Sequence, residues 1–268
     1  MAARASQTLA VAFPSHEPYP LTGMLELAVA ETLGPGATRP ERVTRVLSTV
    51  FKRISGQSAN LSRVRCLTSS AREWLLQRAA GLFWSDTGWF QAKCMQCDTD
   101  FDIPTELANA PRKPAGQDFP VVTVRTSLGQ RRFEVPNGVH EEHLARAPGS
   151  EPTRTLLAQC GLSPQAVRDA RDFSRDDISR IEAALEAASP EVADEVVTTC
   201  PTCQAQTMAR IDPLDFAFPG VGTLLAEVHA IAATYHWTED AILALPSQRR
   251  HSYARLVQAG PTIGGRRR

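Results

Sequence analysis

The sequence predicts an α+β fold that is mostly helical, with a ribbon split into two cysteine turns and a small inserted subdomain made of a β-hairpin and helices. Three observations predict it. Apolar residues recur at helical spacing in both terminal parts of the chain, two C-x-x-C pairs lie in β-rich surroundings, and a long periodic segment separates these pairs. A chain of 268 residues is long enough for one large core or two small ones.

The first part of the chain combines an arm with a helical unit. Residues 1–20 contain three prolines and little periodicity, which indicates an extended arm. Residues 21–88 are predicted to form an N-terminal helical unit, because apolar residues repeat at helical spacing. Its three expected helices span residues 21–33, 39–54 and 69–83, the second with Pro40 in its first turn.

The middle of the chain is predicted to contain the split ribbon and the insertion. Residues 89–103 and 192–212 surround the two cysteine pairs and are expected to form two hairpins. Residues 104–191 lie between them as an inserted hairpin-and-helix subdomain. Its β-rich runs are 121–126 and 131–135, and its helical patterns are 138–147, 153–160 and 174–188, the last opened by Ser174.

Residues 213–260 are expected to form the C-terminal helices. The stripe through residues 221–235 follows the i, i+3, i+4, i+7 pattern of an amphipathic helix. Thr238 and Ser247 are the expected N-caps of two further helices, the second ending near Gln258. Residues 261–268 are rich in glycine and arginine and are expected to be a frayed tail.

Composition restricts the classes of function. The chain has 29 basic and 29 acidic side chains, and this balance favours protein partners over nucleic acid bound by bulk electrostatics. No segment approaches the roughly 18 consecutive apolar residues of a membrane span, and the N-terminus lacks the features of a signal peptide. We therefore expect a cytoplasmic protein without a membrane partner.

Cys94, Cys97, Cys200 and Cys203 form the most informative pattern in the sequence. Each C-x-x-C pair lets one tight turn present two thiolates to a single ion, and zinc accepts four thiolates in a tetrahedron. The sequence therefore predicts a structural Zn²⁺ site, with two redox sites or unligated thiols as the alternatives. The 102 residues that separate the pairs add only roughly 1.5 kcal/mol of loop entropy over an ordinary spacing.

Two details accompany this prediction. The residue after the second cysteine of a zinc knuckle usually has a left-handed backbone and is often glycine, but here it is Asp98 or Gln204. Cys66 and Cys160 remain outside the set, and their apolar neighbours favour buried small side chains over a fifth ligand or a reactive thiol.

The remaining polar clusters give weak signals. His140 and His143 are three residues apart with both glutamates between them, unlike H-E-x-x-H, so a solvated helix face is expected. His229 and His236 are seven apart and could share a helix face. The chain contains no phosphate-binding glycine loop and no nucleophile elbow, so we expect no enzymatic activity and no small-molecule substrate.

The order of features resembles a known family. The helical unit comes first, and the two knuckles follow on either side of an insertion that contains Arg132-Phe133-Glu134-Val135-Pro136. The C-terminal segment is the most specific part. It contains Glu227-Val228-His229, then Tyr235-His236-Trp237-Thr238-Glu239, and then Arg249-Arg250 before Tyr253. This order of features resembles, over roughly residues 20–259, the baseplate hub assembly chaperone family of T4-like contractile phage tails, whose relatives accompany contractile injection systems. The knuckles depart from the family's C-P-x-C-G pattern.

The resemblance implies a non-enzymatic chaperone or minor component of the baseplate, working in the bacterial host cell with baseplate, hub or spike proteins. Aromatic and arginine side chains are favoured anchors of protein interfaces. The expected partner surface therefore consists of His229, Tyr235, Trp237, Arg250 and Tyr253. The alternative function is a zinc-ribbon adaptor that binds nucleic acid.

Overall fold

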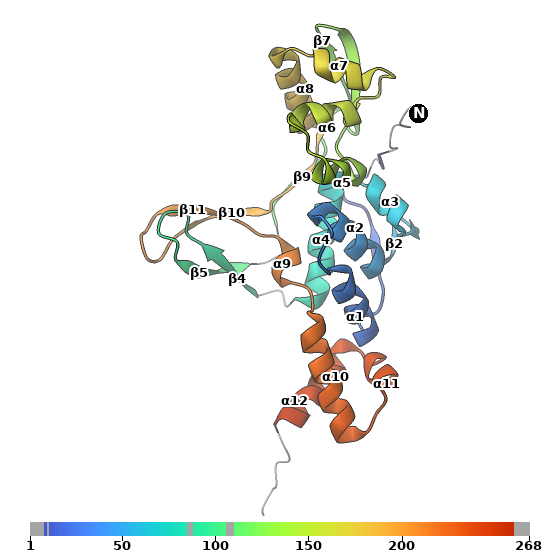
Figure 1. The fold of residues 1–268 in the computed structure, drawn as a ribbon, viewed down its shortest axis with the longest axis vertical. Helices are drawn as coiled ribbons and strands as arrows, with labels where there is room; N and C mark the ends of the chain where they lie inside the picture. The colour runs from blue at the N-terminus through green and yellow to red at the C-terminus, as the bar shows by residue number, and fades with distance from the viewer. Residues whose placement is uncertain (1–7, 10, 85–87, 106–109, 260–268) are drawn as a thin grey trace, which may run out of the picture.

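The computed structural model describes residues 8–9, 11–84, 88–105 and 110–259. Helices alternate with short strands, which form five small antiparallel sheets in these ranges, so the predicted α+β class is confirmed. Figure 1 shows an elongated molecule with the inserted helices at the top, the N-terminal unit in the middle, the C-terminal helices at the bottom and a two-hairpin arm at the side.

The N-terminal unit packs helices around one apolar core that includes Val46, Leu47, Leu75 and Leu76. Its elements are β1 (His16–Pro18), α1 (Gly23–Thr32), α2 (Arg39–Val50), β2 (Phe51–Ile54), β3 (Gln57–Ser58), α3 (Leu61–Cys66) and α4 (Ser69–Phe83). The prediction for residues 69–83 is confirmed, and Thr68 caps this helix by accepting from the Ala71 N–H.

The helix expected over 39–54 is wrong at its end, because residues 51–54 form a strand. β2 pairs on one side with β1, and it buries Phe51 and Ile54 at its two ends. This strand partner lies more than thirty residues away in sequence, so local periodicity gave no sign of it. The described part of the expected extended arm is therefore held against the N-terminal core, with Phe13 packed on it.

The inserted subdomain begins and ends at a two-strand neck, in which β6 (Arg112–Lys113) pairs with β9 (Glu191–Val192). Its separate core includes Val122, Phe133 and Ile181. The remaining elements are β7 (Val121–Thr126), β8 (Gly129–Glu134), α5 (Gly138–Arg146), α6 (Pro152–Cys160), α7 (Ala166–Asp172) and α8 (Arg175–Ala188). The predicted hairpin and three helices are present, and α7 is an additional helix.

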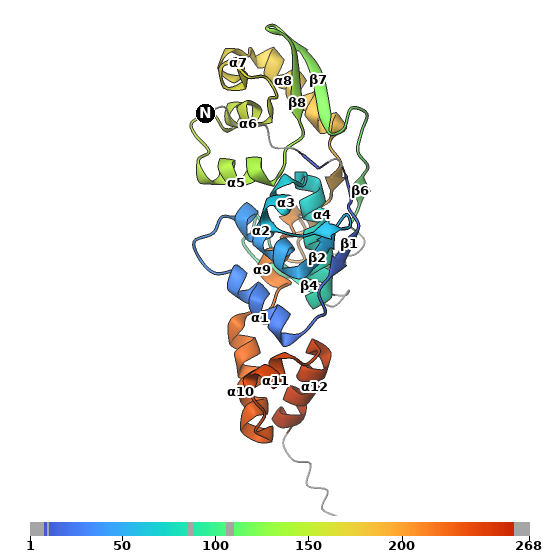
Figure 2. The same cartoon turned by 90° about the vertical axis from the view of Figure 1, so that its right-hand side faces the viewer.

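Figure 2 shows from the side that α5 lies against the helices of the N-terminal unit, and a buried polar joint connects the two. The Arg72 side chain is 1% exposed, and its Nε lies 3.0 Å from Oε2 of Glu141. Glu142 is buried beside Arg65, and His140 is buried with Nε2 3.3 Å from Glu134. The expected solvated face of this helix is therefore wrong for three of its four residues, because Glu141 and Glu142 pair across the joint and His140 pairs with Glu134 of the same subdomain. His143 is exposed, as expected.

Three helices form the C-terminal end of the described chain: α10 (Val221–Tyr235), α11 (Glu239–Leu243) and α12 (Ser247–Gln258). They enclose a small core around Leu224, Ile231 and Ile242. Thr238 caps α11 as predicted, whereas α12 begins after Pro246, and Ser247 is its first helical residue rather than its cap. The expected tail at 261–268 lies outside the described residues.

Candidate metal centre

The cysteine pairs lie at the tips of two hairpins that together form the arm. The strands are β4 (Gly88–Lys93), β5 (Asp100–Thr105), β10 (Glu195–Thr199) and β11 (Gln206–Arg210). Their inner faces share a small cluster in which Ala92, Ile103 and Ala209 are buried. At the base of the arm, Phe90 contacts Phe216 of the short helix α9 (Pro213–Phe216), with ring centroids 5.3 Å apart.

The structure brings together the four cysteines that the sequence selects. The sulfur atoms of Cys94, Cys97, Cys200 and Cys203 all lie within 4.8 Å of one another. Sγ of Cys94 is 3.7 Å from Sγ of Cys203, and Sγ of Cys97 is 3.7 Å from Sγ of Cys200. These separations exceed a disulfide bond of about 2.05 Å and allow one metal ion to lie among four thiolates.

The two turns have matching backbones. The N–H of Asp98 donates to the Cys94 carbonyl at 3.0 Å, and the N–H of Gln204 donates to the Cys200 carbonyl at 3.0 Å. Both residues are left-handed, with φ of 62° and 61°. The second knuckle therefore reproduces the first, although neither position is glycine.

Neighbouring donors favour the thiolate form at the first turn. The N–H groups of Cys97 and Gln96 point at the Cys94 sulfur and lower the pKa of this thiol to about 6. The Thr99 side chain, 3.4 Å from the Cys97 sulfur, lowers the pKa of that thiol. Deprotonated thiols are the form that binds metal, so this environment prepares the first turn for an ion. In the second turn the pKa of Cys203 is raised to about 12: the Ala205 N–H lowers it, but the sulfurs of the other three cysteines lie beside it.

Thr207 is a supporting residue that the sequence analysis did not select. Its buried hydroxyl lies 3.9 Å from the Cys94 sulfur and accepts from the Met95 N–H at 3.2 Å, so it connects the second hairpin to the first turn. Thr207 lies two residues before Ala209 on β11, so both side chains lie on the buried face of the strand, and this spacing is the signal that could have identified it.

The two remaining cysteines lie far from this centre in the sequence. Cys160 is fully buried, and its burial raises the pKa of the thiol to about 12. Its sulfur lies 3.5 Å from Nδ1 of His140 within the buried joint. Cys66 is half-buried at the end of α3. A protonated, enclosed Cys160 thiol is unreactive.

The residues of the expected partner surface divide into two groups. Tyr235, Trp237 and Tyr253 form one aromatic cluster, with centroid separations of 5.0 to 5.7 Å. Tyr235, Trp237 and His229 are exposed, and Tyr253 is half-buried against the C-terminal core. The expectation that Arg250 belongs to this surface is wrong. The side chain is 1% exposed and pairs with Glu26 of α1 and with Glu227 of α10, the latter at 3.0 Å.

Helical spacing could have identified the buried position of Arg250. The residue lies four positions before Ala254, which is buried on the core face of α12. His236 also departs from the expectation, because α10 ends at Tyr235 and His236 takes a left-handed C-cap conformation with φ of 57°. It therefore does not share a helix face with His229.

One described segment, Pro213–Tyr235, has the length and hydropathy of a membrane span. It is interrupted between α9 and α10, however, and α10 alone has 15 residues, or about 22 Å of helix, against a hydrocarbon core of about 30 Å. Leu224, Val228 and Ile231 of this helix are buried within the C-terminal bundle.

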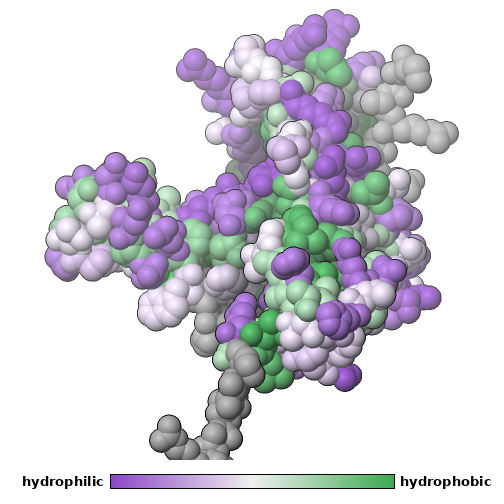
Figure 3. Space-filling model, turned by 60° about the horizontal axis from the view of Figure 1, so that its bottom comes forward, coloured by the Kyte–Doolittle hydropathy of each residue, from purple (hydrophilic) through white to green (hydrophobic). Residues whose placement is uncertain are grey.

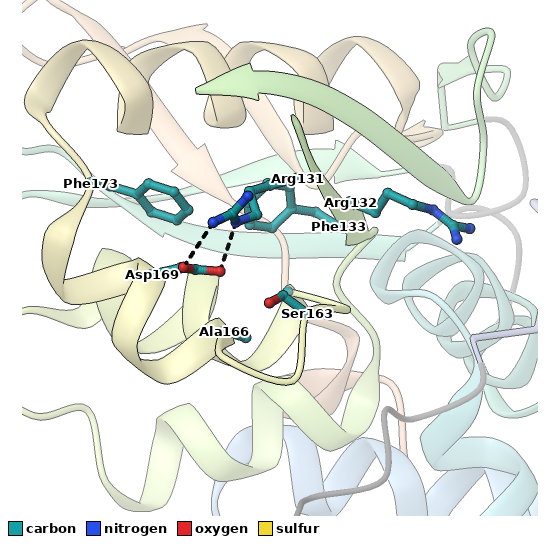
Figure 4. A pocket seen from close by; sticks show the side chains of 8 residues that line it. Arg131, Arg132, Phe133, Ser163, Ala166, Asp169 and Phe173 are labelled. Atoms are coloured by element: carbon teal, nitrogen blue, oxygen red, sulfur yellow. Dashed lines mark hydrogen bonds and ion pairs between the residues drawn. The ribbon is translucent and has the colours of Figure 1, made fainter. Parts of the chain in front are cut away.

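A pocket in the inserted subdomain is closed by its own ion pair. Figure 4 shows Arg131 and Asp169 joined by two contacts, of which the shorter is 2.8 Å, beside the rings of Phe133 and Phe173. No space for a water molecule remains there. A second, open depression of about 470 Å³ lies between α6 and α8.

No family model, no curated protein and no solved structure matches this chain. The fold and the site define a mixed helix-and-sheet protein with four clustered cysteines compatible with a metal ion.

Proposed function

We propose that Cys94, Cys97, Cys200 and Cys203 hold one structural Zn²⁺ and that the arm is a zinc ribbon. The sulfur separations of 3.7 Å carry this proposal. A tetrahedron with Zn–S bonds of about 2.3 Å has edges of about 3.8 Å. Four thiolates complete the coordination of zinc and leave no position for a substrate or for a reactive water.

Elemental analysis of protein purified without added metal tests the zinc site. We expect about one zinc per chain, and loss of that zinc in Cys200→Ser. The Cys66→Ser variant is the matched control and should retain it. Iron in place of zinc, or protein that folds and holds no metal, would show that the proposal is wrong.

We propose further that the protein is a non-enzymatic assembly factor of a contractile-tail or injection-system baseplate. The support is the resemblance of the C-terminal segment together with the exposure of its aromatic residues. Tyr235, Trp237 and Tyr253 contact one another at the end of the C-terminal bundle. Figure 3 shows hydrophobic surface exposed on this end of the molecule. Clustered, accessible aromatic rings are suited to anchor a protein partner.

Co-expression with baseplate, hub and spike proteins of a contractile tail or injection system tests this role. Wild-type protein should co-purify with at least one of them, and Trp237→Ala with Tyr253→Ala should abolish the association. Tyr19→Ala, at an exposed tyrosine of the N-terminal unit, is the control and should not. Unchanged association in the folded double variant would contradict the proposed surface.

The nucleic-acid alternative has less support. Residues 88–105 and 194–211 of the arm contain five carboxylates and two basic side chains, a formal charge of −3. Such a surface repels phosphate. Salt titrations with DNA and RNA should therefore detect no binding at low salt, and binding that weakens steeply with salt would favour the alternative.

A further inference from the structure

Strand β10 of the arm is a sheet edge with backbone groups that have no partner. Among the described residues it pairs only with β11. The Cys200 N–H donates to the Ala205 carbonyl, so the hydrogen-bonded pairs of this antiparallel ladder fall at the even-numbered residues of β10. The N–H and C=O groups of Glu195, Val197 and Thr199 therefore point away from β11. No hydrogen bond joins these groups to another described residue.

The edge of β10 is open to solvent. Figure 1 shows that β10 and β11 belong to an arm that projects sideways from the helices. On the inner face of the hairpin, Thr207 and Ala209 of β11 are buried against the first hairpin, whereas Val196 and Thr198 of β10 are only half-buried. β11 therefore lies closer to the first hairpin, and β10 is the more accessible strand of the pair.

β10 also lacks the features by which sheet edges usually avoid other chains. Proteins protect such edges with proline, lysine, bulges or a covering element. Elsewhere in this chain, β1 ends in Pro18 with a shift of register, and β5 contains Pro104. Residues 195–199 contain neither proline nor lysine, their register has no shift, and all but the first are β-branched. The strand is therefore suited to pair with an added strand.

The outer side chains of β10 define the chemistry of the strand that fits. Glu195 and Val197 lie on the same face, because they are two residues apart. Val197 is 66% exposed beside Met208, which is 55% exposed. Glu195 has no ion pair among the described residues, since Arg210 opposite it pairs with Asp194. Neighbouring residues of an added strand share this face, so the fitting strand has an apolar side chain two positions from a basic one.

The charge of the arm opposes pairing with the same edge of a second copy. Residues 88–105 and 194–211 have a formal charge of −3, so two arms placed edge to edge repel each other. An extended segment of another protein that contains a basic residue meets the opposite charge instead.

We propose that β10 binds an extended segment of a partner protein as an added strand. The backbone of that segment bonds to the outward N–H and C=O groups of Glu195, Val197 and Thr199. Its basic side chain lies beside Glu195, and its apolar side chain lies beside Val197. The contact is separate from the aromatic cluster of the C-terminal bundle, so both surfaces can be occupied at once.

Binding of a synthetic peptide to the full-length, metal-loaded protein tests this contact. The fluorescein-labelled peptide Thr-Arg-Thr-Val-Thr-Val-Thr places its arginine and valines on one face of a strand. We expect saturable binding below about 1 mM in fluorescence anisotropy. Methylation of one alternate set of peptide nitrogens should abolish binding. Methylation of the other set should change the dissociation constant less than about twofold, because only one set faces β10.

Two proline variants of the protein form a matched pair. Val197→Pro removes an N–H from the proposed edge, and Met208→Pro removes the equivalent N–H from the opposite edge of the hairpin. Neither N–H bonds within the ladder, so both variants should keep the metal content of wild type. Val197→Pro should raise the dissociation constant about tenfold, and Met208→Pro less than about twofold. If a proline variant loses its metal, the methylated peptides decide the question.

Charge reversal tests the basic position. Glu195→Arg should weaken binding of the arginine peptide about fivefold and strengthen binding of a copy with glutamate in place of arginine. Sedimentation of the protein without peptide should give a monomer. The proposal would be overturned by no binding of the arginine peptide at about 1 mM, by equal effects of the two methylated sets or of the two proline variants, by an unchanged charge preference in Glu195→Arg, or by a dimer that Val197→Pro dissociates.

Discussion

Asp98 and Gln204, 106 positions apart, hold the same left-handed backbone conformation after the second cysteine of their turns. A non-glycine residue pays on the order of 1 kcal/mol for this conformation, and Asp tolerates it better than Gln. We therefore expect Gln204→Gly to tighten metal binding about fivefold in a chelator competition. Met95→Gly, at a position outside the left-handed set, is the control and should weaken binding; a tighter Met95→Gly would contradict the backbone explanation.

Removal of the metal is expected to unfold the arm and leave the body intact. The arm's own buried cluster consists of Ala92, Ile103 and Ala209, too little to hold two hairpins together, whereas the N-terminal and inserted cores contain none of the metal cysteines. Hydrogen exchange after chelation should show lost protection in residues 88–105 and 194–211 and retained protection in α4 and α8. Loss of protection throughout the molecule would show that the metal supports the whole fold.

Arg250 is expected to be a major stabilising residue of the C-terminal bundle. Arg250→Met would leave Glu26 buried without its partner, at a cost of about 3–5 kcal/mol in the free energy of unfolding. Combination with Glu26→Leu should recover part of this loss, because the unpaired charge is then removed. Arg249→Met, which loses an exposed contact over the Tyr253 ring and a hydrogen bond of 3.4 Å to the Tyr253 hydroxyl, should cost less than about 1 kcal/mol in the same urea titration.

Asp177 is expected to hold the tip of the inserted hairpin to α8. This buried carboxylate accepts from the N–H and hydroxyl of Ser127 and from Ser174 at the helix start, and these bonds keep the pKa of Asp177 well below its usual range. Asp177→Ala should lower the free energy of unfolding by about 1–3 kcal/mol. Asp176 is the exposed neighbour, and Asp176→Ala should lower the free energy of unfolding by less than half as much. Equal losses of stability in the two variants would contradict the role of Asp177.

His16 is expected to make stability depend on pH. Half-buried between the rings of Phe51 and Trp74, it has a pKa lowered from 6.5 by desolvation. The unfolded chain therefore binds this proton more readily than the folded one, and stability should fall as the pH drops below about 6.5. Thermal unfolding of His16→Leu between pH 7.5 and 5 should show a smaller decline than wild type, and parallel declines would exclude His16 as the cause.

Strong local patterns predicted much of this fold. Residues 69–83 and 221–235 are helical within the expected limits, because their apolar stripes and their caps or breaks are encoded in one stretch of sequence. The four cysteines were selected by spacing alone and lie together. The strand at 51–54 and the buried joint at Glu141 and Glu142 depend on partners distant in sequence, which periodicity within one segment does not specify.

The inserted subdomain also has a consequence for synthesis. A ribosome releases about 5–20 residues per second. Cys97 therefore leaves it roughly 5–20 s before Cys200. During that interval the first pair can offer an ion only two sulfurs, while the inserted segment between the pairs emerges and has time to fold. The order of translation thus makes closure of the metal site a late event. The site closes only after the inserted subdomain has emerged, and its closure joins the two ends of that subdomain.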